Sequence, residues 1–431
     1  MKINPVMQRV GRLTRGWQAF IAQPDARILR WCLKTDSSRM LDAFLAWHNE
    51  EDSDLNDLFI VLPVPFEKPE QFARSLIQHL ADEFEIADED FKSMELPAGW
   101  QPARSPDDLE TIQDLIAAAT SLQMHYADFV EHVALVLMPP AIEDRKLWQA
   151  WLHDLARVSY WPASVRVLIA DWIPALPLKA WADDYDKMVV SQRPILDMEG
   201  LPLEILAHIP GSGPAFEFRR LFVQIGTVAN RGRLDQVKIL STLALAIAST
   251  QGWHSLAAAV EMLVAGAFLS KGKQEPAIES YRQARDLAMK ANAADPSRPK
   301  TIITTNLALS GSLVGQGKFE EARKYYYEAA KVADAANDSF AAFESRRMAS
   351  YCGEQLGDHK SALRDGQEAM RLLESVPADD RLQSTAPHLA LRLTEMSGRP
   401  ELAQQARSIE QLCNQTLVGD WRSVANASMR T

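Results

Sequence analysis

The polar residues that could hold a phosphate stand just after the first apolar stretch of the chain, in residues 34–39. Lys34, Thr35 and Ser37 are types that bind phosphates or magnesium in nucleotide-binding proteins. A phosphate chain also needs glycines, whose backbone amides can approach its oxygens closely. This segment has no glycine, and GxxxxGK[ST] occurs nowhere in the sequence. Asp171 ends a later apolar stretch as a magnesium-binding acid would, but a single aspartate there is more often a helix cap or turn residue.

Two further groups could do chemistry by their residue types alone. His125, Asp128 and His132 lie near helical spacing with Glu131 beside them, and two histidines with a carboxylate can bind a metal. The helix that carries His125 is expected to end before His132, which favours a solvated helix end. The carboxylate clusters at 50–52 and 183–186 lie in polar runs, whereas a catalytic pair needs one acid in an apolar pocket.

Motifs of the common enzyme classes are absent, because no GxSxG, HExxH or reactive-cysteine context occurs. Cys32, Cys352 and Cys413 are far apart and odd in number. This pattern is typical of reduced, buried thiols and not of disulfides or zinc sites. We therefore predict no catalytic residue, no metal and no cofactor. An enzyme of another kind would need a pocket lined by carboxylates or by His125.

The elements that would position these residues alternate between strand and helix in residues 1–210. Strands are predicted at 27–34, 57–64, 133–138 and 165–171, and helices after Asp36, from Pro69, over 105–129, after 140 and over 178–190. Strands that are apolar throughout favour a mainly parallel sheet covered on both faces, so we predict an α/β layer domain. The helix after 140 carries Leu147, Trp151, Leu152 and Leu155 in line. Because Trp148 and Trp151 cannot share one face fully, one of them is predicted to be exposed.

Residues 268–284 introduce a different pattern, which repeats. Phe268, Gly272, Ala277, Tyr281 and Ala284 suit two antiparallel helices, since glycine ends the first helix and the small residues let the second approach. The frame returns around later glycines and has an earlier candidate, at Gly317, Gly357, Gly398 (degenerate) and Gly232. The spacings of 40 to 45 residues indicate a repeat array.

Composition separates this array from what precedes it. Residues 1–214 hold nine of the 11 tryptophans and 17 of the 23 prolines, and helical repeats tolerate few internal prolines. The segment 209–214, with two glycines and two prolines, is predicted to be the linker. We therefore predict two domains, at 1–210 and 216–431.

The best copies, GKQEPAIESYRQA and GKFEEARKYYYEA, resemble the tetratricopeptide repeat, a helix–turn–helix unit. The resemblance covers residues 216–410, although the copies are longer than the family's period of about 34 residues and lack its tryptophan and Leu-Gly pair. It implies an all-α solenoid whose first helices form a concave surface for a protein or peptide. The residues that match its contact positions are Met262, Leu269, Leu307, Val314, Glu344, Arg347, Met348 and Tyr351.

These contact positions are apolar in two copies and mixed in the third, which suits an amphipathic helix or an apolar peptide. The alternative is that the apolar part packs against a helix of the same chain. Some family members hold a terminal carboxylate with Lys, Arg and Asn; here Met262, Gly266 and Leu307 stand at those positions. The resemblance therefore does not imply a carboxylate clamp.

Charge and hydropathy narrow the functional class. The net charge of −11 argues against a nucleic-acid or anionic-membrane surface. No run of about 20 apolar residues could cross a bilayer, and residues 1–20 lack the apolar core of a secretion signal. We predict a cytoplasmic, non-catalytic adaptor or chaperone-like scaffold that holds a protein client. The alternative is a regulatory signalling protein with a degenerate nucleotide-binding α/β domain and a repeat sensor.

Overall fold

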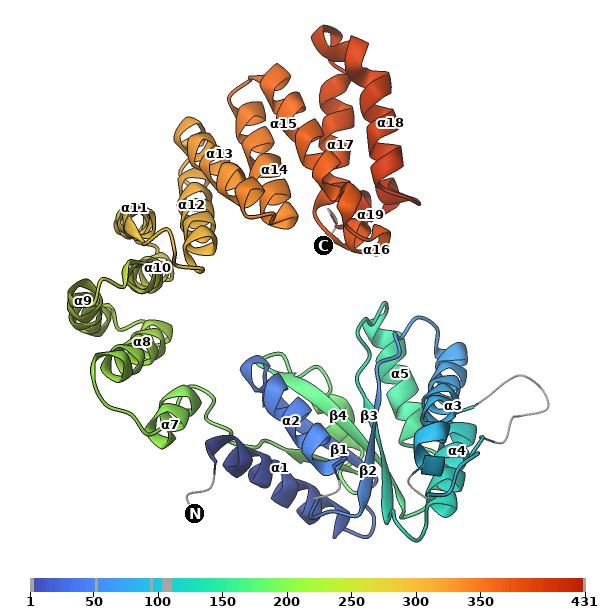
Figure 1. Ribbon diagram of the computed structural model, residues 1–431. Helices are drawn as coiled ribbons and strands as arrows, with labels where there is room; N and C mark the ends of the chain where they lie inside the picture. The colour runs from blue at the N-terminus through green and yellow to red at the C-terminus, as the bar shows by residue number, and fades with distance from the viewer. Residues whose placement is uncertain (1–3, 51–52, 94–95, 103–110, 429–431) are drawn as a thin grey trace. The chain divides into compact units, whose positions relative to one another are not determined.

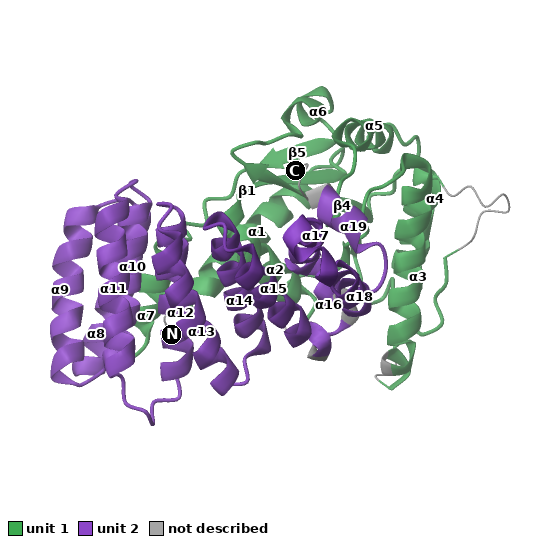
Figure 2. Cartoon of the chain, turned by 90° about the horizontal axis from the view of Figure 1, so that it is seen from above, with its two compact units in different colours: residues 1–209 green, residues 210–431 purple. Residues whose placement is uncertain are grey.

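The computed structural model (Figure 1) describes residues 4–50, 53–93, 96–102 and 111–428. The chain divides into two compact units, Met1–Ile209 and Pro210–Thr431 (Figure 2). Within the described residues, no helix combines the length and the apolar character needed to cross a membrane.

Unit 1 is built on five strands that all run parallel, in the order β2-β3-β4-β1-β5. Parallel neighbours need crossover connections, which the helices supply. The strands are β1 (Ile28–Lys34), β2 (Asp57–Leu62), β3 (His132–Leu137), β4 (Val165–Ile173) and β5 (Val189–Gln192). The helices are α1 (Pro5–Ile21), α2 (Ser38–His48), α3 (Pro69–Ser93), α4 (Ile112–His125), α5 (Arg145–Leu155), α6 (Lys179–Asp184) and α7 (Leu201–His208), with a 3₁₀ turn, η1 (Thr35–Ser37).

Each face of this sheet carries its own apolar core, because successive strand residues point to opposite sides. In β3, Val133, Leu135 and Leu137 belong to the core under α3 to α6, while Ala134 and Val136 belong to the core under α1 and α2. Figure 1 shows α1 and α2 on one face and α3 to α5 on the other. The predicted α/β layer with a parallel sheet is confirmed.

Three local predictions in unit 1 were wrong or incomplete. The predicted helix over 178–190 is a short α6 followed by β5, whose pairing with β1 decides its conformation. Helix α1 was not predicted, although Pro5 begins it and Leu13 and Trp17 are fully buried in its core. The predicted helix start at 105–108 lies outside the described residues; α4 begins after a capping box at Thr111 and ends at His125, four residues before the predicted end.

The tryptophan pair of α5 was also predicted wrongly. Trp148 and Trp151 are both buried, and their rings stack with centroids 5.6 Å apart. Residues three apart on a helix are neighbours on one side, and Phe72 of α3 contacts both rings edge-on. Leu147, which was placed in line with the buried residues, is instead 43% exposed.

Unit 2 consists of helices joined mainly by tight turns. They are α8 (Pro214–Asn230), α9 (Leu234–Thr250), α10 (His254–Leu269), α11 (Gln274–Lys290), α12 (Arg298–Val314), α13 (Phe319–Ala335), α14 (Ser339–Gln355), α15 (His359–Leu372), α16 (Ala378–Gln383), α17 (Ala386–Ser397), α18 (Ala406–Thr416) and α19 (Trp421–Ser428), with the 3₁₀ turns η2 (Leu373–Ser375) and η3 (Pro400–Gln405). Consecutive helices from α8 to α15 pack against each other. The predicted helical-repeat solenoid is confirmed.

One turn geometry closes the hairpins α8–α9, α10–α11, α12–α13 and α14–α15. Gly272 has φ +68°, and the amide after it, of Lys273, donates to the carbonyl of Phe268 at 3.0 Å. This is a Schellman closure, which needs a left-handed residue that glycine provides without strain. It explains why the frame pairs each glycine with a residue four positions earlier. The other glycines with this geometry are Gly232, Gly317 and Gly357.

The small residues of the frame lie where the second helix of each hairpin meets the first. Ala277, Ala284, Ala322 and Ala329 are fully buried. In the third copy, Gly366 replaces the aromatic residue because Leu393 occupies that space: a Cβ on Gly366 would stand 2.5 Å from Leu393 Cδ2.

The copy at Gly398 departs from the frame in structure as in sequence. Gly398 has a right-handed φ of −70°, and η3 precedes α18. Conversely, the same closure joins successive hairpins at Gly252 and at Asn337. The frame did not include these two turns, because the residue nine positions later is Glu261 or Arg346 instead of an aromatic residue, and Asn337 is not a glycine.

Candidate partner-binding face

The eight predicted contact residues lie on α10, α12 and α14, the first helices of three successive hairpins. Helix α10 packs against α12, and α12 packs against α14. The positions ten, six and three residues before each turn glycine therefore form rows across neighbouring helices. We call the surface made by these rows the first-helix face. The contact of a partner with these eight residues remains a prediction.

The apolar contact residues are neither fully buried nor fully free. Met262, Leu307, Val314 and Met348 are half-buried and pack against the core between these hairpins. Leu269 is 38% exposed. The alternative of packing within the chain is thus true for part of each side chain, while the rest faces outward.

A row of glycines runs through this face, six residues before the turn glycines of the first three hairpins. Its members are Gly226 of α8, Gly266 of α10 and Gly311 of α12. A Cβ on any of them would have no heavy atom within 4 Å beyond the helix's own backbone and its chain neighbours. All three are at least partly exposed. The packing of the chain itself therefore does not require glycine at these positions.

Helices α8 and α10 border a cleft of about 660 Å³ along this row. Gly226 and Gly266 line it together with Met262, and Arg231 and Lys271 stand at its turn end. Where the glycines lie, few side chains project into the cleft. Near the turns, its lining includes the cations Arg231 and Lys271.

The fourth hairpin ends the glycine row with charged and aromatic side chains. Arg347 Nη2 lies 2.7 Å from Glu344 Oε2, and Thr385 donates to the other oxygen of Glu344. The Arg392 guanidinium lies over the Tyr351 ring, 5.6 Å from its centroid. These groups are positioned by one another before any partner arrives.

Arg392 of α17 and Thr385, which precedes this helix, were missed as members of the face. They lie six and thirteen residues before Gly398, the positions that Tyr351 and Glu344 hold relative to Gly357. The frame therefore gives both residues once the degenerate copy is included. The loss of the turn and of the aromatic positions obscured this signal.

In unit 1, a second cleft lies at the carboxyl end of β1. It has a volume of about 420 Å³, and Cys32, Lys34, Ser37 and Arg193 are among its lining residues. The chain leaves β1 and β4 toward opposite faces of the sheet here, the place where parallel sheets commonly bind ligands. Burial raises the pKa of the Cys32 thiol, which keeps it protonated near neutral pH.

The segment in which a phosphate loop would lie ends β1 at Lys34 and continues as the 3₁₀ turn η1, Thr35–Ser37. Ser37 Oγ donates to Asp36, not outward. Asp171 lies beneath this region and pairs with Arg30, whose Nε is 2.7 Å from Asp171 Oδ2. It also accepts the amide of Leu178, so it holds the loop before α6.

The groups considered for metal binding and for acid–base chemistry lie apart from one another. His125 ends α4 and His132 begins β3, where its Nδ1 lies 2.7 Å from Asp57 Oδ1. Asp183 pairs with Lys179 on the surface of α6. Part of the cluster at 50–52 lies outside the described residues. Among the residues that are described, no group of three metal-ligating side chains comes together.

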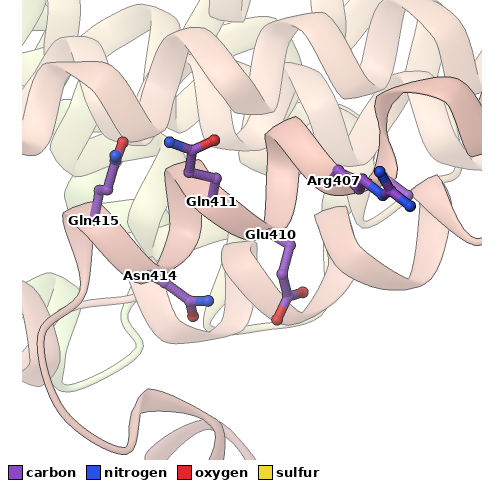
Figure 3. A pocket seen from close by; sticks show the side chains of 6 residues that line it. Arg407, Glu410, Gln411, Asn414 and Gln415 are labelled. Carbon is purple, nitrogen blue, oxygen red and sulfur yellow. The ribbon is translucent and has the colours of Figure 1, made fainter.

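Helix α18 carries a shallow depression on one face (Figure 3). Its lining residues all belong to α18, so no second element encloses a ligand there. Asn414 accepts a hydrogen bond from Trp421 Nε1 at 3.0 Å, and Glu410 pairs with Arg422. This face is a solvated helix surface.

Comparison with known proteins gives structural neighbours only. No family model and no curated protein matches the sequence. One similar solved structure is the repeat region of a putative kinesin light chain from Podosopora anserina, with nearly identical TPR-like repeats (14% identity, 52% of this chain and 100% of that chain, TM-score 0.36). A second is a Rap protein complexed with competence and sporulation factor (14%, 84% and 77%, 0.33). A third is a signal transduction ATPase with a tetratricopeptide repeat sensor from Pyrococcus horikoshii (10%, 93% and 76%, 0.33).

Proposed function

We propose that the chain holds a polypeptide partner along the first-helix face, as a scaffold that performs no chemistry itself. The observation that carries this proposal is the glycine row formed by Gly226, Gly266 and Gly311. A glycine inside a helix costs about 0.5–1 kcal/mol relative to alanine. No contact within the described chain offsets that cost at these positions. A partner backbone that approaches α8, α10 and α12 closely would offset it.

The side chains around the row support an apolar partner segment with a polar end. Met262, Leu307 and Val314 present half-buried apolar surface beside the glycines. At the far end, Tyr351 offers an aromatic ring, and the Arg392 guanidinium that lies over this ring is paired with Glu354. An amphipathic helix or an apolar peptide followed by an aromatic or polar residue fits this sequence of surfaces.

Substituting leucine for glycines of the row tests partner binding without destabilising the fold. Gly266→Leu and Gly311→Leu each place a Cβ where no heavy atom outside the helix's own backbone lies within 4 Å, and leucine favours helix over glycine, so we expect helix stability to be kept or raised. We expect the protein that co-purifies with the wild-type chain from source-cell lysate to be lost from both variants. Quantitative mass spectrometry of the bound fraction measures this.

The matched control is Lys324→Leu, which adds the same side chain to an exposed position of α13, the second helix of its hairpin. It should recover the same partner as wild type. If the wild type and both glycine variants recover the partner equally while circular dichroism shows that all of them are folded, the partner does not bind along the glycine row.

A second proposal, that unit 1 binds a regulatory nucleotide, is favoured by one observation. The cleft at the carboxyl end of β1 lies at the switch point of the sheet, where parallel sheets commonly bind ligands, and Lys34 and Arg193 line it together with the carboxylates Asp36, Asp197 and Glu199. A ligand that binds only the native state raises the melting temperature. The same melting temperature with and without ATP or GTP would leave only the scaffold proposal.

A further inference from the structure

A third cleft lies within unit 2, apart from the first-helix face. It has a volume of about 470 Å³ and opens between the second half of α11, the first half of α12 and the second half of α13. None of the predicted contact residues lines it. The lining residues are Arg285, Met289, Arg298, Pro299, Ile302, Asn306, Glu328, Lys331, Val332, Ala335 and Ala336.

The charges of this cleft do not cancel. Three cations, Arg285, Arg298 and Lys331, face a single carboxylate, Glu328. Glu328 Oε2 already accepts from Arg285 Nη2 at 2.6 Å. For Arg298, the hydrogen bond seen is a long one, 3.5 Å from its Nη2 to the carbonyl of Met289. The charges of Arg298 and Lys331 therefore have no carboxylate partner among the described residues, in a protein whose net charge is −11.

Two buried donors in this cleft lack an acceptor. Asn306 is fully buried, and its Oδ1 accepts from Arg285 Nε at 3.1 Å. That bond fixes the amide orientation, because the opposite orientation would point an N–H group at the guanidinium. The Asn306 nitrogen, like Arg298 Nε, has no hydrogen-bond partner among the described residues. A buried donor without an acceptor is costly, so an acceptor from outside the chain would stabilise the site.

The remaining wall of the cleft is apolar. Met289 is 45% exposed, and Pro299, Ile302 and Val332 line the space beside the cations. A hydrated inorganic ion would leave this surface in water, whereas a ligand with a hydrocarbon part would cover it.

We propose that this cleft binds an organic anion: a carboxylate or phosphate carried on a short apolar group. The anionic head accepts from Arg298 and from the Asn306 amide, and Lys331 neutralises the remaining charge. The hydrocarbon lies against Ile302, Val332 and Met289. This inference is independent of the scaffold proposal, because the two surfaces share no named residue.

Titration calorimetry on the full chain tests the proposal with hexanoate, hexyl phosphate and neutral 1-hexanol as probes. We expect at least one of the two anions to bind and the alcohol not to bind. Binding should weaken as salt rises, since opposite charges are screened. Binding of the alcohol as tightly as of both anions, or of none of the three, would overturn the assignment.

Three variants test whether the anion binds in this cleft. Arg298→Gln and Lys331→Gln remove one charge each, and Asn306→Asp keeps the shape but turns the free donor into an acceptor. Each should weaken anion binding about tenfold or more. Lys360→Gln, at an exposed lysine of α15, removes the same charge elsewhere and should bind as wild type does. Arg298 is only half-buried as a whole residue, so Arg298→Gln should fold, and unchanged affinity of this variant would contradict the site even where Asn306→Asp fails to fold.

Discussion

The two units bury apolar surface in opposite ways. Unit 1 gathers large side chains such as Trp17 and Trp148 into two cores, one on each face of the sheet. Unit 2 divides its apolar surface among several clusters between neighbouring helices, and some of them are built mainly from small residues such as Ala284 and Ala333. A sheet core joins segments distant in sequence, while repeats join neighbours. A destabilising substitution should therefore affect the whole of unit 1, whereas in unit 2 its effect should be confined to adjacent helices.

The two units also differ in how deeply they bury charged side chains. Unit 1 encloses an ion pair, Arg30–Asp171, in which both side chains are no more than 3% exposed. Several pairs between helices of unit 2 lie closer to solvent, as in Arg282–Glu321 and Arg285–Glu328, while Arg323–Asp365 is more deeply buried. The tryptophans make this comparison measurable, since nine of 11 precede residue 215 and report on unit 1.

The largest expected effect is in the sheet. Asp171→Ala leaves Arg30 buried without its partner, and breaking a buried pair costs about 3–5 kcal/mol. Tryptophan fluorescence during urea unfolding should show the loss. The double variant Arg30→Met with Asp171→Leu should recover most of it, because it removes both charges. A wild-type midpoint for the single variant would mean that water already solvates this pair.

The next effect contrasts two glycines of unit 2. Gly366→Ala places a Cβ against the buried Leu393 and should destabilise by about 1–3 kcal/mol. Gly311→Ala meets open space and should stabilise by up to about 1 kcal/mol. Hydrogen exchange of α15 and α12, respectively, measures both locally. If both substitutions changed the stability in the same direction, the packing around these two glycines would not differ as the structure indicates.

The pH dependence of unit 2 should respond to Glu261 of α10. Burial raises the pKa of this carboxyl above its ordinary 4.5, against the opposing hydrogen bond from Ser280. The folded state thus holds the proton more tightly than the unfolded chain, so stability is lost as pH rises through the raised pKa. Glu261→Gln should therefore gain stability relative to wild type as the pH rises from 5 to 8. If the difference in unfolding free energy between Glu261→Gln and the wild type did not change with pH, Glu261 would be solvated in the folded state.

The smallest stability effect should come from the first-helix face. Arg347→Ala removes a pair in which both side chains are about a quarter exposed, and such pairs contribute about 1 kcal/mol or less. If the face binds a partner, recovery of that partner should fall by more than stability does. Tyr351→Ala provides a second measurement, and full recovery by both variants would place the partner elsewhere.

Sequence patterns were reliable where the cause of structure is local. The turn at Gly272 depends on one left-handed residue and on hydrogen bonds within six residues, so its spacing could be seen without coordinates. The apolar strands were recognised for a similar reason. Strand β5 was missed because its four residues gain their conformation only from pairing with β1.

Local patterns in the sequence were sufficient to predict that this chain joins a parallel α/β layer to stacked helical hairpins, because periodicity and turn chemistry depend on neighbouring residues. The open space beside Gly226, Gly266 and Gly311, and the shared cleft of Arg298 and Asn306, were visible only in the folded chain. Whether a glycine is needed for packing, or a donor lacks an acceptor, depends on atoms from other helices. Those distances follow from how the hairpins stack, which no single segment specifies.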